Sequence, residues 1–564
     1  MSDFSSRLPA RPSLEQLQKQ AKELLKQYHA GESAALDRFR AVSPRFSEPN
    51  RTPPSLADTQ FVLAREYGFQ DWARLKEQVG IMRASGPLFI SSKSPFYTID
   101  WVENLISVQG PQTEKDWDAV FGVMKEHKIS KLTADGISDA ALGRLPNLDQ
   151  VTHLHIGGSR GVTDHGIGQL ARMPHLQDLV FGGRSSPVTD GGLDVLRHLA
   201  ELRRFQACWT PGLSDTGLAG LNRCDHLEDV NLLGTQTGDG AIQALIGKRQ
   251  LRRFQSGQRV TDSGLALLHK FPIFSTWQGG DIKYGLMTAD AEPNYLLIDG
   301  PFTDAGLARL AGLDGLFALS LFWHTPAFTS EGLAPLKLLP NLGFLGCQDN
   351  HCDDKAMRHI AAFPRLRMLM GQGAVASDAG FEALSRSQTI EYFWGRECPN
   401  LTGRGFTALA AIPSLRGLAV SCKNVNDASL SKLTDFPALR EFMPMDVDDA
   451  GFRYLGSCEN LEALWCMYCR DTGDAATDHI SGLSRLKTYY AGKTNITDRS
   501  LEILARMTSL EHLEFWQCAG LTDVGMRQLA GLPHLREISL DGLPNVTRQA
   551  AASFPAHVRV RYSE

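Results

Sequence analysis

The sequence lacks any long apolar run: nowhere in its 564 residues do 18 consecutive apolar side chains occur, so we expect no membrane-spanning helix. Its first residues also lack the apolar core of a secretory signal, which favours a cytoplasmic chain. The net charge is only −5, so the chain has no general attraction for nucleic acid. With 43% hydrophobic and 21% charged residues, the composition excludes a disordered chain. These observations leave a folded protein that binds neither membrane nor nucleic acid.

Catalytic signatures are also scarce. The chain contains no GxxxxGK[ST] phosphate loop, no HExxH zinc motif and no second CxxC beside Cys466–Cys469. His153, His155 and Asp178 are expected on one side of two neighbouring strands, and this arrangement suits either a metal ion or an ordinary polar surface. We therefore predict a protein that is not an enzyme and holds no cofactor and no metal.

What the sequence does contain is a repeated motif: an aliphatic residue, Thr or Ser, Asp, any residue, Gly or Ala, then a hydrophobic residue. Copies include Val162–Ile167, Val260–Leu265 and Leu521–Met526. With the Asp position as the anchor, fifteen of the sixteen intervals between positions 139 and 548 are 22–26 residues long. The remaining interval, from Asp262 to Asp304, is 42 residues long. Such regular recurrence is typical of a stack of structural repeats.

Each unit combines a helix with a strand. In the unit of Asp164, Ile167 and Leu170 have helical spacing, and Pro174 ends the helix. Thr or Asp at the helix start can cap its free N–H groups. The following residues, 176–181, have the Leu-x-x-Leu-x-Leu-like pattern of a short strand. One helix and one strand per unit predict an α/β fold, a right-handed leucine-rich-repeat solenoid with a parallel inner sheet and outer helices over 137–546.

The units resemble the cysteine-containing subtype of leucine-rich repeats, as in F-box proteins. The motif Leu521–Met526 carries the resemblance, together with four cysteines that each lie five residues before an anchor: Cys398, Cys422, Cys469 and Cys518. The resemblance covers roughly residues 110–564 and is specific for the fold, not for the function. It also leaves open a substrate-recognition subunit or effector of a ubiquitin-ligase type, although the start at Leu8-Pro9 does not continue in the F-box pattern.

Residues 1–85 do not follow the repeat and are predicted to form a small all-α domain. Segments 18–25 and 64–69, with Trp72, resemble a helical leader found before ankyrin or leucine-rich repeats in bacterial proteins, which implies a bacterial, cytoplasmic origin. Residues 86–136 are expected to form a linker and the N-terminal cap, and 547–564 the C-terminal cap that a solenoid needs.

The long interval contains an irregular segment, 279–294. Phe274 and Trp277 are expected to supply one strand of this interval, and Tyr295–Asp299 another. The segment between them lacks a helical period, so it is either an insertion without a role or a functional loop. The second possibility would allow an enzyme or a small-ligand binder built on this loop.

Strand alternation sends every second residue to the concave side of the solenoid. In the early units these positions are polar, whereas in the later units they are aromatic or Met, with one Arg. Such a stripe predicts a surface that binds a protein or peptide partner, on a monomer or weak oligomer. Two alternatives are a register shifted by one residue, which would place these side chains in the core, and mutual burial on a tightly curved face. The predicted surface consists of Phe322, Trp323, Phe344, Met370, Tyr392, Trp394, Arg396, Met443, Met445, Trp465, Met467, Tyr468, Tyr490 and Trp516.

Overall fold

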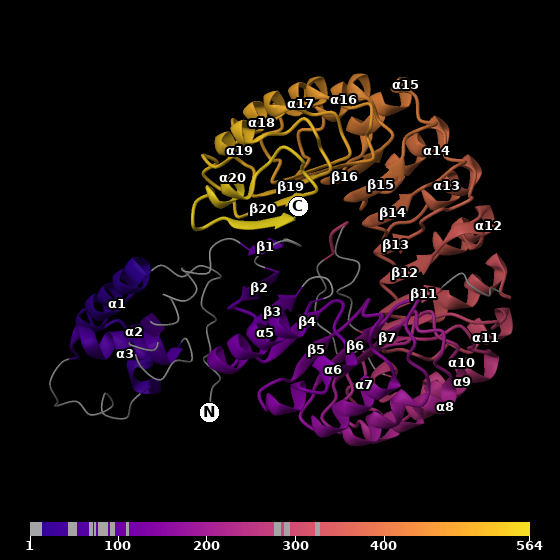
Figure 1. Ribbon diagram of the computed structural model, residues 1–564. Helices are drawn as coiled ribbons and strands as arrows, with labels where there is room; N and C mark the ends of the chain where they lie inside the picture. The colour runs from indigo at the N-terminus through magenta and orange to yellow at the C-terminus, as the bar shows by residue number, and fades with distance from the viewer. Residues whose placement is uncertain are drawn as a thin grey trace.

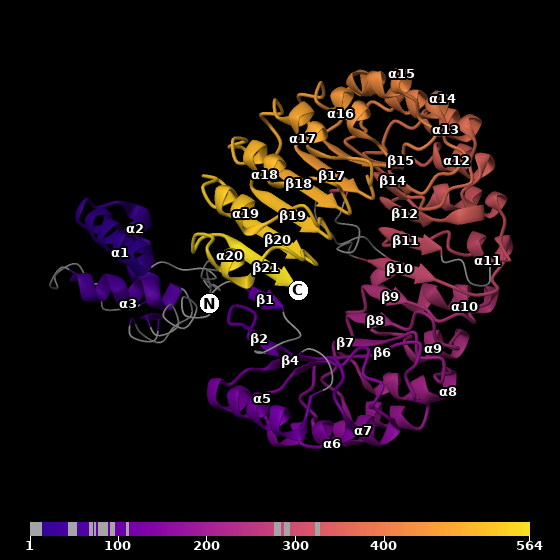
Figure 2. The ribbon, with the colours of Figure 1, turned by 45° about the horizontal axis from the view of Figure 1, so that its top comes forward.

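A computed structural model of the full chain describes residues 14–42, 54–66, 72, 75–76, 88–90, 96–108, 112–275, 284–286, 294–321 and 327–563. It contains a small group of helices and a long solenoid that bends into a nearly complete ring (Figure 1). Strands line the inner wall of the ring and helices its outer wall (Figure 2). The predicted leucine-rich-repeat solenoid is confirmed.

The helices at the N-terminus pack around their own small core. Leu24, Phe39 and Val62 are buried together, one from each helix. Arg38 donates two hydrogen bonds of 2.7 Å to Glu66, which joins the second helix to the third. The three helices are α1 (Leu14–His29), α2 (Ser33–Val42) and α3 (Leu56–Glu66).

In the part of the chain that the structure describes, twenty-one strands form a single sheet. Each is three to five residues long because each repeat contributes only the width of the inner wall. The strands are β1 (Leu88–Ile90), β2 (Tyr97–Asp100), β3 (Leu105–Val108), β4 (Lys131–Ala134), β5 (His153–His155), β6 (Asp178–Gly182), β7 (Arg204–Cys208), β8 (Asp229–Asn231), β9 (Arg253–Gln255), β10 (Tyr295–Ile298), β11 (Ala318–Leu321), β12 (Phe344–Cys347), β13 (Met368–Met370), β14 (Tyr392–Arg396), β15 (Gly417–Ser421), β16 (Glu441–Met445), β17 (Ala463–Met467), β18 (Thr488–Gly492), β19 (His512–Trp516), β20 (Glu537–Asp541) and β21 (Arg559–Ser563).

The outer wall consists of short α-helices, several of which continue into a 3₁₀ turn. They are α5 (Glu114–His127), α6 (Asp139–Leu142), α7 (Asp164–Gln169), α8 (Asp215–Leu218), α9 (Asp239–Ala244), α10 (Asp262–Leu267), α11 (Asp304–Ala308), α12 (Asp354–Ile360), α13 (Asp378–Leu384), α14 (Gly403–Ala408), α15 (Asp427–Leu430), α16 (Asp449–Leu455), α17 (Asp474–Ile480), α18 (Asp498–Leu504), α19 (Asp523–Leu529) and α20 (Arg548–Ala552). In two units a 3₁₀ helix replaces the α-helix, over Gly192–His198 and Ser330–Leu338.

The sheet is parallel from β3 to β21, and the two ends of the ring lie close together. β2 pairs antiparallel with β3 at one edge, whereas β1 pairs parallel with β21 at the other. Asp100 of β2 forms an ion pair with Arg559 of β21 at 3.9 Å. Because β1 and β2 are consecutive strands, the chain before the repeats covers both edges of an otherwise open sheet.

The anchor Asp joins each repeat to the next. Thr522 donates its backbone N–H to Oδ1 of Asp498 (2.8 Å) and its hydroxyl to Oδ2 (2.5 Å). The same two bonds run from Thr497 to Asp474, and equivalent pairs recur along the solenoid. In turn, Thr522 accepts the N–H of Val524 at the start of α19. The sequence predicted capping by Thr or Asp; in these units Thr caps the helix and Asp binds the following repeat.

This ladder explains the Gly of the motif. A Cβ on Gly525 would lie 2.5 Å from Oδ1 of Asp498, and one on Gly166 would lie 2.0 Å from Oδ1 of Asp139. Both distances are far below van der Waals contact, so the Asp carboxylate of one repeat occupies the space that a side chain would need. Thr, Asp and Gly therefore act together as one contact between repeats.

The long interval is one repeat with an insertion. The predicted strand at Phe274 was wrong: Phe274 ends the 3₁₀ helix Pro272–Phe274, and Trp277 lies outside the described residues. The physical reason is that β10 already occupies the place beside β9, with Tyr295 paired to Arg253. The predicted strand at 295–299 is confirmed as β10.

Candidate binding surface on the concave face

The two faces of the sheet pack into different clusters. Leu345, Phe393 and Phe442 point into the continuous core between sheet and helices. Their chain neighbours Phe344 and Tyr392 belong to a separate cluster on the concave side. The stripe of aromatic and Met residues therefore lies on the concave wall, and the alternative of a one-residue shift in register is excluded.

Burial divides the predicted residues into two groups. Seven are partly exposed: Met370, Trp394, Arg396, Trp465, Met467, Tyr468 and Trp516. Phe344, Tyr392, Met443, Met445 and Tyr490 are buried, with 0–7% of each residue exposed, so the expectation that they are accessible to a partner needs correction. Concave side chains on adjacent parallel strands lie about 4.8 Å apart, so large ones cover each other. Phe322 and Trp323 lie outside the described residues.

A second cause of burial is a segment of the chain itself, Tyr284–Leu286, which lies against β11–β16. The Tyr284 ring stacks on Phe317 with centroids 5.9 Å apart, and its centroid lies 6.4 Å from that of Tyr392. Leu286 is fully buried in the concave cluster. We call this site the covered groove; it consists of Phe317, Ala318, Phe344, Met368, Tyr392, Ala419 and Met443.

Polar groups fix the segment at both ends. Glu441 Oε2 accepts the backbone N–H of Leu286 at 2.7 Å, although the two residues are 155 positions apart. Burial raises the pKa of Glu441, and the hydrogen bonds from Leu286 and Tyr392 oppose that shift. At the other end, the Arg367 guanidinium lies 4.8 Å above the Tyr284 ring.

Sequence reasoning missed Tyr284, Leu286 and Glu441 as parts of this site. Two glycines could have indicated it, because they stand at the concave strand edge where other repeats carry larger residues. A Cβ on Gly343 would lie 2.4 Å from the Phe317 ring, and one on Gly417 would lie 2.4 Å from the Tyr392 ring. The two glycines therefore make room for the rings that contact Tyr284.

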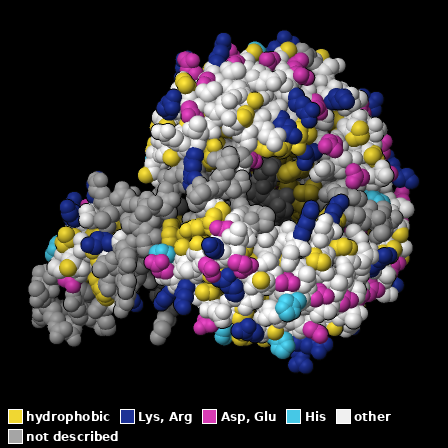
Figure 3. All heavy atoms as spheres, in the orientation of Figure 1, with side chains coloured by type: hydrophobic (Ala, Val, Ile, Leu, Met, Phe, Trp, Pro, Cys, Tyr) yellow, Lys and Arg dark blue, Asp and Glu magenta, His cyan; other side chains and the backbone are white. Residues whose placement is uncertain are grey.

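The rest of the stripe remains accessible, and hydrophobic side chains line the central hollow of the ring (Figure 3). Tyr468 and Trp516 meet edge to face, with ring centroids 6.0 Å apart. Lys493 lies 4.6 Å from the Trp516 ring and 5.4 Å from the Tyr468 ring, and Arg396 lies 5.8 Å from the Tyr468 ring. We call this site the open surface; it consists of Met370, Trp394, Arg396, Trp465, Met467, Tyr468, Lys493 and Trp516.

Backbone conformation positions part of the open surface. Arg396, Tyr468 and Lys493 have φ of 41°, 57° and 55°, a left-handed region that non-glycine residues rarely adopt. Asp446 and Gln517 have the same conformation at the equivalent place in their repeats. Side chains in this column are therefore held at the carboxyl ends of the strands by a repeated turn.

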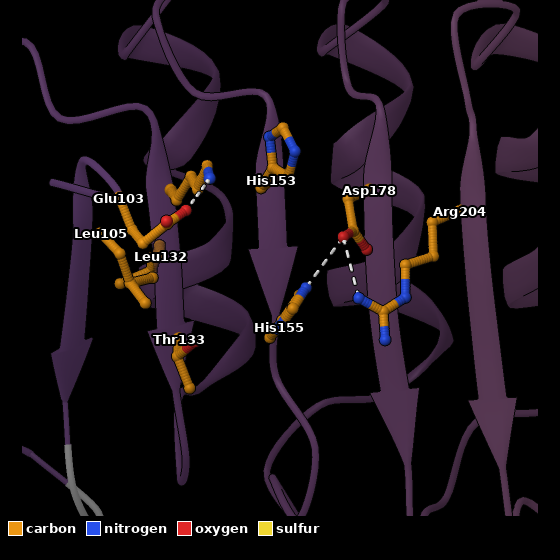
Figure 4. Close-up of a pocket in the computed structure, with 9 residues that line it drawn as sticks. Glu103, Leu105, Leu132, Thr133, His153, His155, Asp178 and Arg204 are labelled. Carbon is orange, nitrogen blue, oxygen red and sulfur yellow. Dashed lines mark hydrogen bonds and ion pairs between the residues drawn. The ribbon is translucent and has the colours of Figure 1, made fainter. Parts of the chain in front are cut away.

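The early half of the concave wall is polar and contains a cavity of about 330 Å³. Figure 4 shows His155 and Arg204 converging on the buried Asp178 from the two strands beside it. Asp178 Oδ2 lies 3.1 Å from His155 Nε2 and 3.6 Å from Arg204 Nη1. The next carboxylate, Asp229, lies 3.8 Å from Arg204 and 3.7 Å from Arg253. Burial raises the pKa of Asp229, while the two arginines act in the opposite direction.

The two histidines of the metal alternative have different neighbours. His155 pairs with Asp178, whereas His153 Nδ1 lies 2.8 Å from the hydroxyl of its neighbour Thr152. Burial lowers the pKa of His153. Among the residues that the structure describes, no three His, Cys, Asp or Glu side chains are grouped as a metal site.

The cysteines are packing residues. All ten are free thiols, and burial raises the pKa of Cys466 and brings that of Cys469 to about 11. Cys469 Sγ donates to the carbonyl of Pro444 at 3.3 Å, and Cys518 does the same to Ala491 at 3.4 Å. These contacts link adjacent repeats, which matches the expected core role of the Cys466–Cys469 pair.

One further motif resembles a catalytic signature. Gly157-Gly158-Ser159-Arg160-Gly161 matches the GxSxG pattern of a nucleophile elbow. However, Ser159 is buried, donates its hydroxyl to the carbonyl of Ala134 at 3.1 Å and accepts the N–H of Gly136 at 2.9 Å. Its hydroxyl thus closes a turn between repeats.

No protein-family model matches the chain. Two solved structures are similar over most of its length. An internalin from Listeria monocytogenes has 15% sequence identity and a TM-score of 0.25, covering 78% of this chain and 88% of that chain. The complex of Rad7 and Elc1 from yeast has 15% sequence identity and a TM-score of 0.36, covering 79% of this chain and 92% of that chain. None of the helices in the described ranges is long and apolar enough to cross a membrane.

Proposed function

We propose that this chain is a non-enzymatic scaffold that binds a protein or peptide partner on the concave face, through the open surface. The observation that carries the proposal is the group of Trp465, Tyr468 and Trp516, which remain partly exposed inside the ring. Large aromatic side chains on a water-facing wall are costly unless a partner covers them.

The composition of the open surface supports this function. Trp, Tyr and Arg are the residue types that contribute most to binding energy at protein interfaces, and Met adapts its shape to different partners. Lys493 and Arg396 lie beside the rings and form no ion pair with a carboxylate of the described residues, so they can offer donors to a partner's acceptor groups. The surface therefore combines apolar contact area with hydrogen-bonding capacity.

The test begins with selection of peptides from a random displayed library on the immobilised full chain. The dissociation constants of the selected peptides are then measured by fluorescence anisotropy for the wild type and for Trp465→Ala, Tyr468→Ala and Trp516→Ala. Loss of one central aromatic side chain costs about 2 kcal/mol, so we expect about thirtyfold weaker binding for at least one variant.

Val524→Ala and Leu338→Ala are the matched controls, because these apolar residues are 54% and 61% exposed in the helical layer, on α19 and on the 3₁₀ helix Ser330–Leu338. Both should leave the affinity unchanged. Equal binding by all five variants, or no peptide enriched above background, would refute the proposed surface.

A further inference from the structure

The covered groove holds Tyr284–Leu286 by contacts of the kind that hold a bound peptide. The Tyr284 ring lies between Phe317 and Tyr392, and the Leu286 side chain is fully enclosed. The backbone N–H of Leu286 is bound by the side chain of Glu441. Two side chains that fill apolar sites and one paired backbone group are elements by which a protein can recognise a short peptide.

The receiving wall is built around this occupant. Gly343 and Gly417 leave room for the Phe317 and Tyr392 rings, each of which would lie 2.4 Å from a Cβ there, and these rings contact Tyr284. Glu391 binds the Arg367 guanidinium at 2.8 and 3.0 Å, which fixes the cation over the Tyr284 ring. The wall therefore presents a preformed aromatic site, an aliphatic site and an acceptor between strands β11 and β16.

None of these contacts depends on the covalent connection between the segment and the wall. A peptide with an aromatic residue two positions before an aliphatic one can place the same three groups if it adopts the backbone path of Tyr284–Leu286. We propose that the covered groove is a second peptide-binding site, specific for this aromatic-x-aliphatic pattern, and that Tyr284–Leu286 occupies it as an internal ligand that such a partner displaces. The groove borders the open surface, of which four residues pack against the groove cluster: Met370, Trp394, Trp465 and Met467. The inference is argued from the contacts of Tyr284–Leu286 and does not rest on the proposed function.

Occupation by the chain itself lowers the apparent affinity for a partner in a predictable way. A tethered segment acts at an effective concentration in the millimolar range. The apparent dissociation constant of an external peptide rises in inverse proportion to the fraction of free groove. Removing the internal ligand should therefore make the covered groove available to an external peptide.

The probe is a fluorescein-labelled peptide with the sequence of residues 281–290, Asp-Ile-Lys-Tyr-Gly-Leu-Met-Thr-Ala-Asp. Its binding to the full chain is measured by fluorescence anisotropy. We expect Tyr284→Ala/Leu286→Ala to bind it at least about tenfold more tightly than the wild type. A control peptide with Ala in place of Tyr and Leu should not bind. In the double variant, Glu441→Gln should weaken binding, and Trp516→Ala on the open surface should leave it unchanged.

Circular dichroism and thermal unfolding establish that each variant is folded, and Tyr284→Ala alone replaces the double variant if the latter does not fold. A folded variant that fails to bind the peptide would overturn the proposal, and the segment would then be a structural strap. Equal binding by wild type and variant would overturn the claim of internal occupation. A loss of binding on Trp516→Ala would show that the peptide uses the open surface instead.

Discussion

Replacement of Asp474 by Ala tests the ladder that joins the repeats. Asp474 accepts three hydrogen bonds from the next repeat: the Thr497 N–H at 2.8 Å, the Thr497 hydroxyl at 2.6 Å and the Ser500 hydroxyl at 2.6 Å. Thr497 is exposed, so water replaces the lost acceptor for its two donors. Ser500 is fully buried and keeps only its contact with Thr477, at 2.9 Å.

The expected loss of stability follows from this difference in exposure. One buried hydrogen bond to a charged acceptor contributes about 1.5–3 kcal/mol, and the two exposed ones add little. We therefore expect Asp474→Ala to lower the free energy of unfolding by about 2 kcal/mol. The matched control is Asp478→Ala in the same helix, because Asp478 pairs with Arg499 at 2.7 Å with both side chains exposed. That loss should stay within about 0.5 kcal/mol.

The effect should also depend on pH in a defined direction. Burial raises the pKa of Asp474, but the hydrogen bonds from Ser500 and Thr497 outweigh it, so the net pKa is lowered. A lowered native pKa gives stability that is complete above the ordinary Asp pKa, near 3.9, and is lost as the pH falls through the native value. The wild type and Asp474→Ala should therefore converge in acid and differ most at neutral pH.

Urea unfolding followed by circular dichroism measures the difference in the free energy of unfolding of the whole protein. Long repeat arrays can depart from two-state behaviour, so hydrogen exchange of peptides from β18 and β19 is used to measure the difference in local stability. Faster exchange is expected in these strands and not in β5 or β6. An Asp474→Ala effect no larger than that of Asp478→Ala, or one that persists in acid, would contradict the ladder as the main contact between repeats.

Three shorter predictions concern packing, the sheet edge and the thiols. Gly525→Ala should destabilise the protein by about 1–3 kcal/mol in urea because its Cβ would lie 2.5 Å from Asp498 Oδ1, whereas Gly482→Ala, with open space around it, should not. Phe89 lies opposite Tyr562 in the β1–β21 pairing, and Pro is poorly tolerated inside a paired strand, so Phe89→Pro should make amides of β21 exchange faster by mass spectrometry while those of β12 do not change. Iodoacetamide at pH 8 should label only the two half-buried thiols, Cys208 and Cys458, in the native protein and all ten after unfolding; rapid native labelling of a fully buried thiol would contradict the packing role.

The repeat architecture could be predicted from sequence because its determinants are local. Thr, Asp and Gly recur within four positions of each unit, and their contacts reach only the adjacent repeat. The alternation of Leu345 with Phe344 is equally local, which is why the concave stripe lies where the pattern places it. The error at Phe274 arose where the period fails, since the pattern there contains no information about which strand follows β9.

The division of the stripe into a covered and an open part could not be predicted in the same way. It depends on the contact of Leu286 with Glu441 across 155 positions, and no repeat period connects these two residues. Its trace in the sequence is limited to small residues on a wall of large ones, such as Ala318 and Ala419. The burial of Met445 and Tyr490 depends instead on the curvature of the sheet, which accumulates over many repeats.

The same ladder that makes the solenoid regular also determines where the chain can vary. In most units the core aliphatic residues, the capping Thr or Ser, the Asp and the Gly are committed to contacts between repeats, and most exchanges there cost stability. The residue that follows a strand has the same left-handed backbone in four late repeats but carries Asp446, Tyr468, Lys493 or Gln517, which share no chemistry. A repeated backbone with unrelated side chains is a display position rather than a packing position. The carboxyl edge of the concave wall is therefore a place where side-chain identity can vary without cost to the fold.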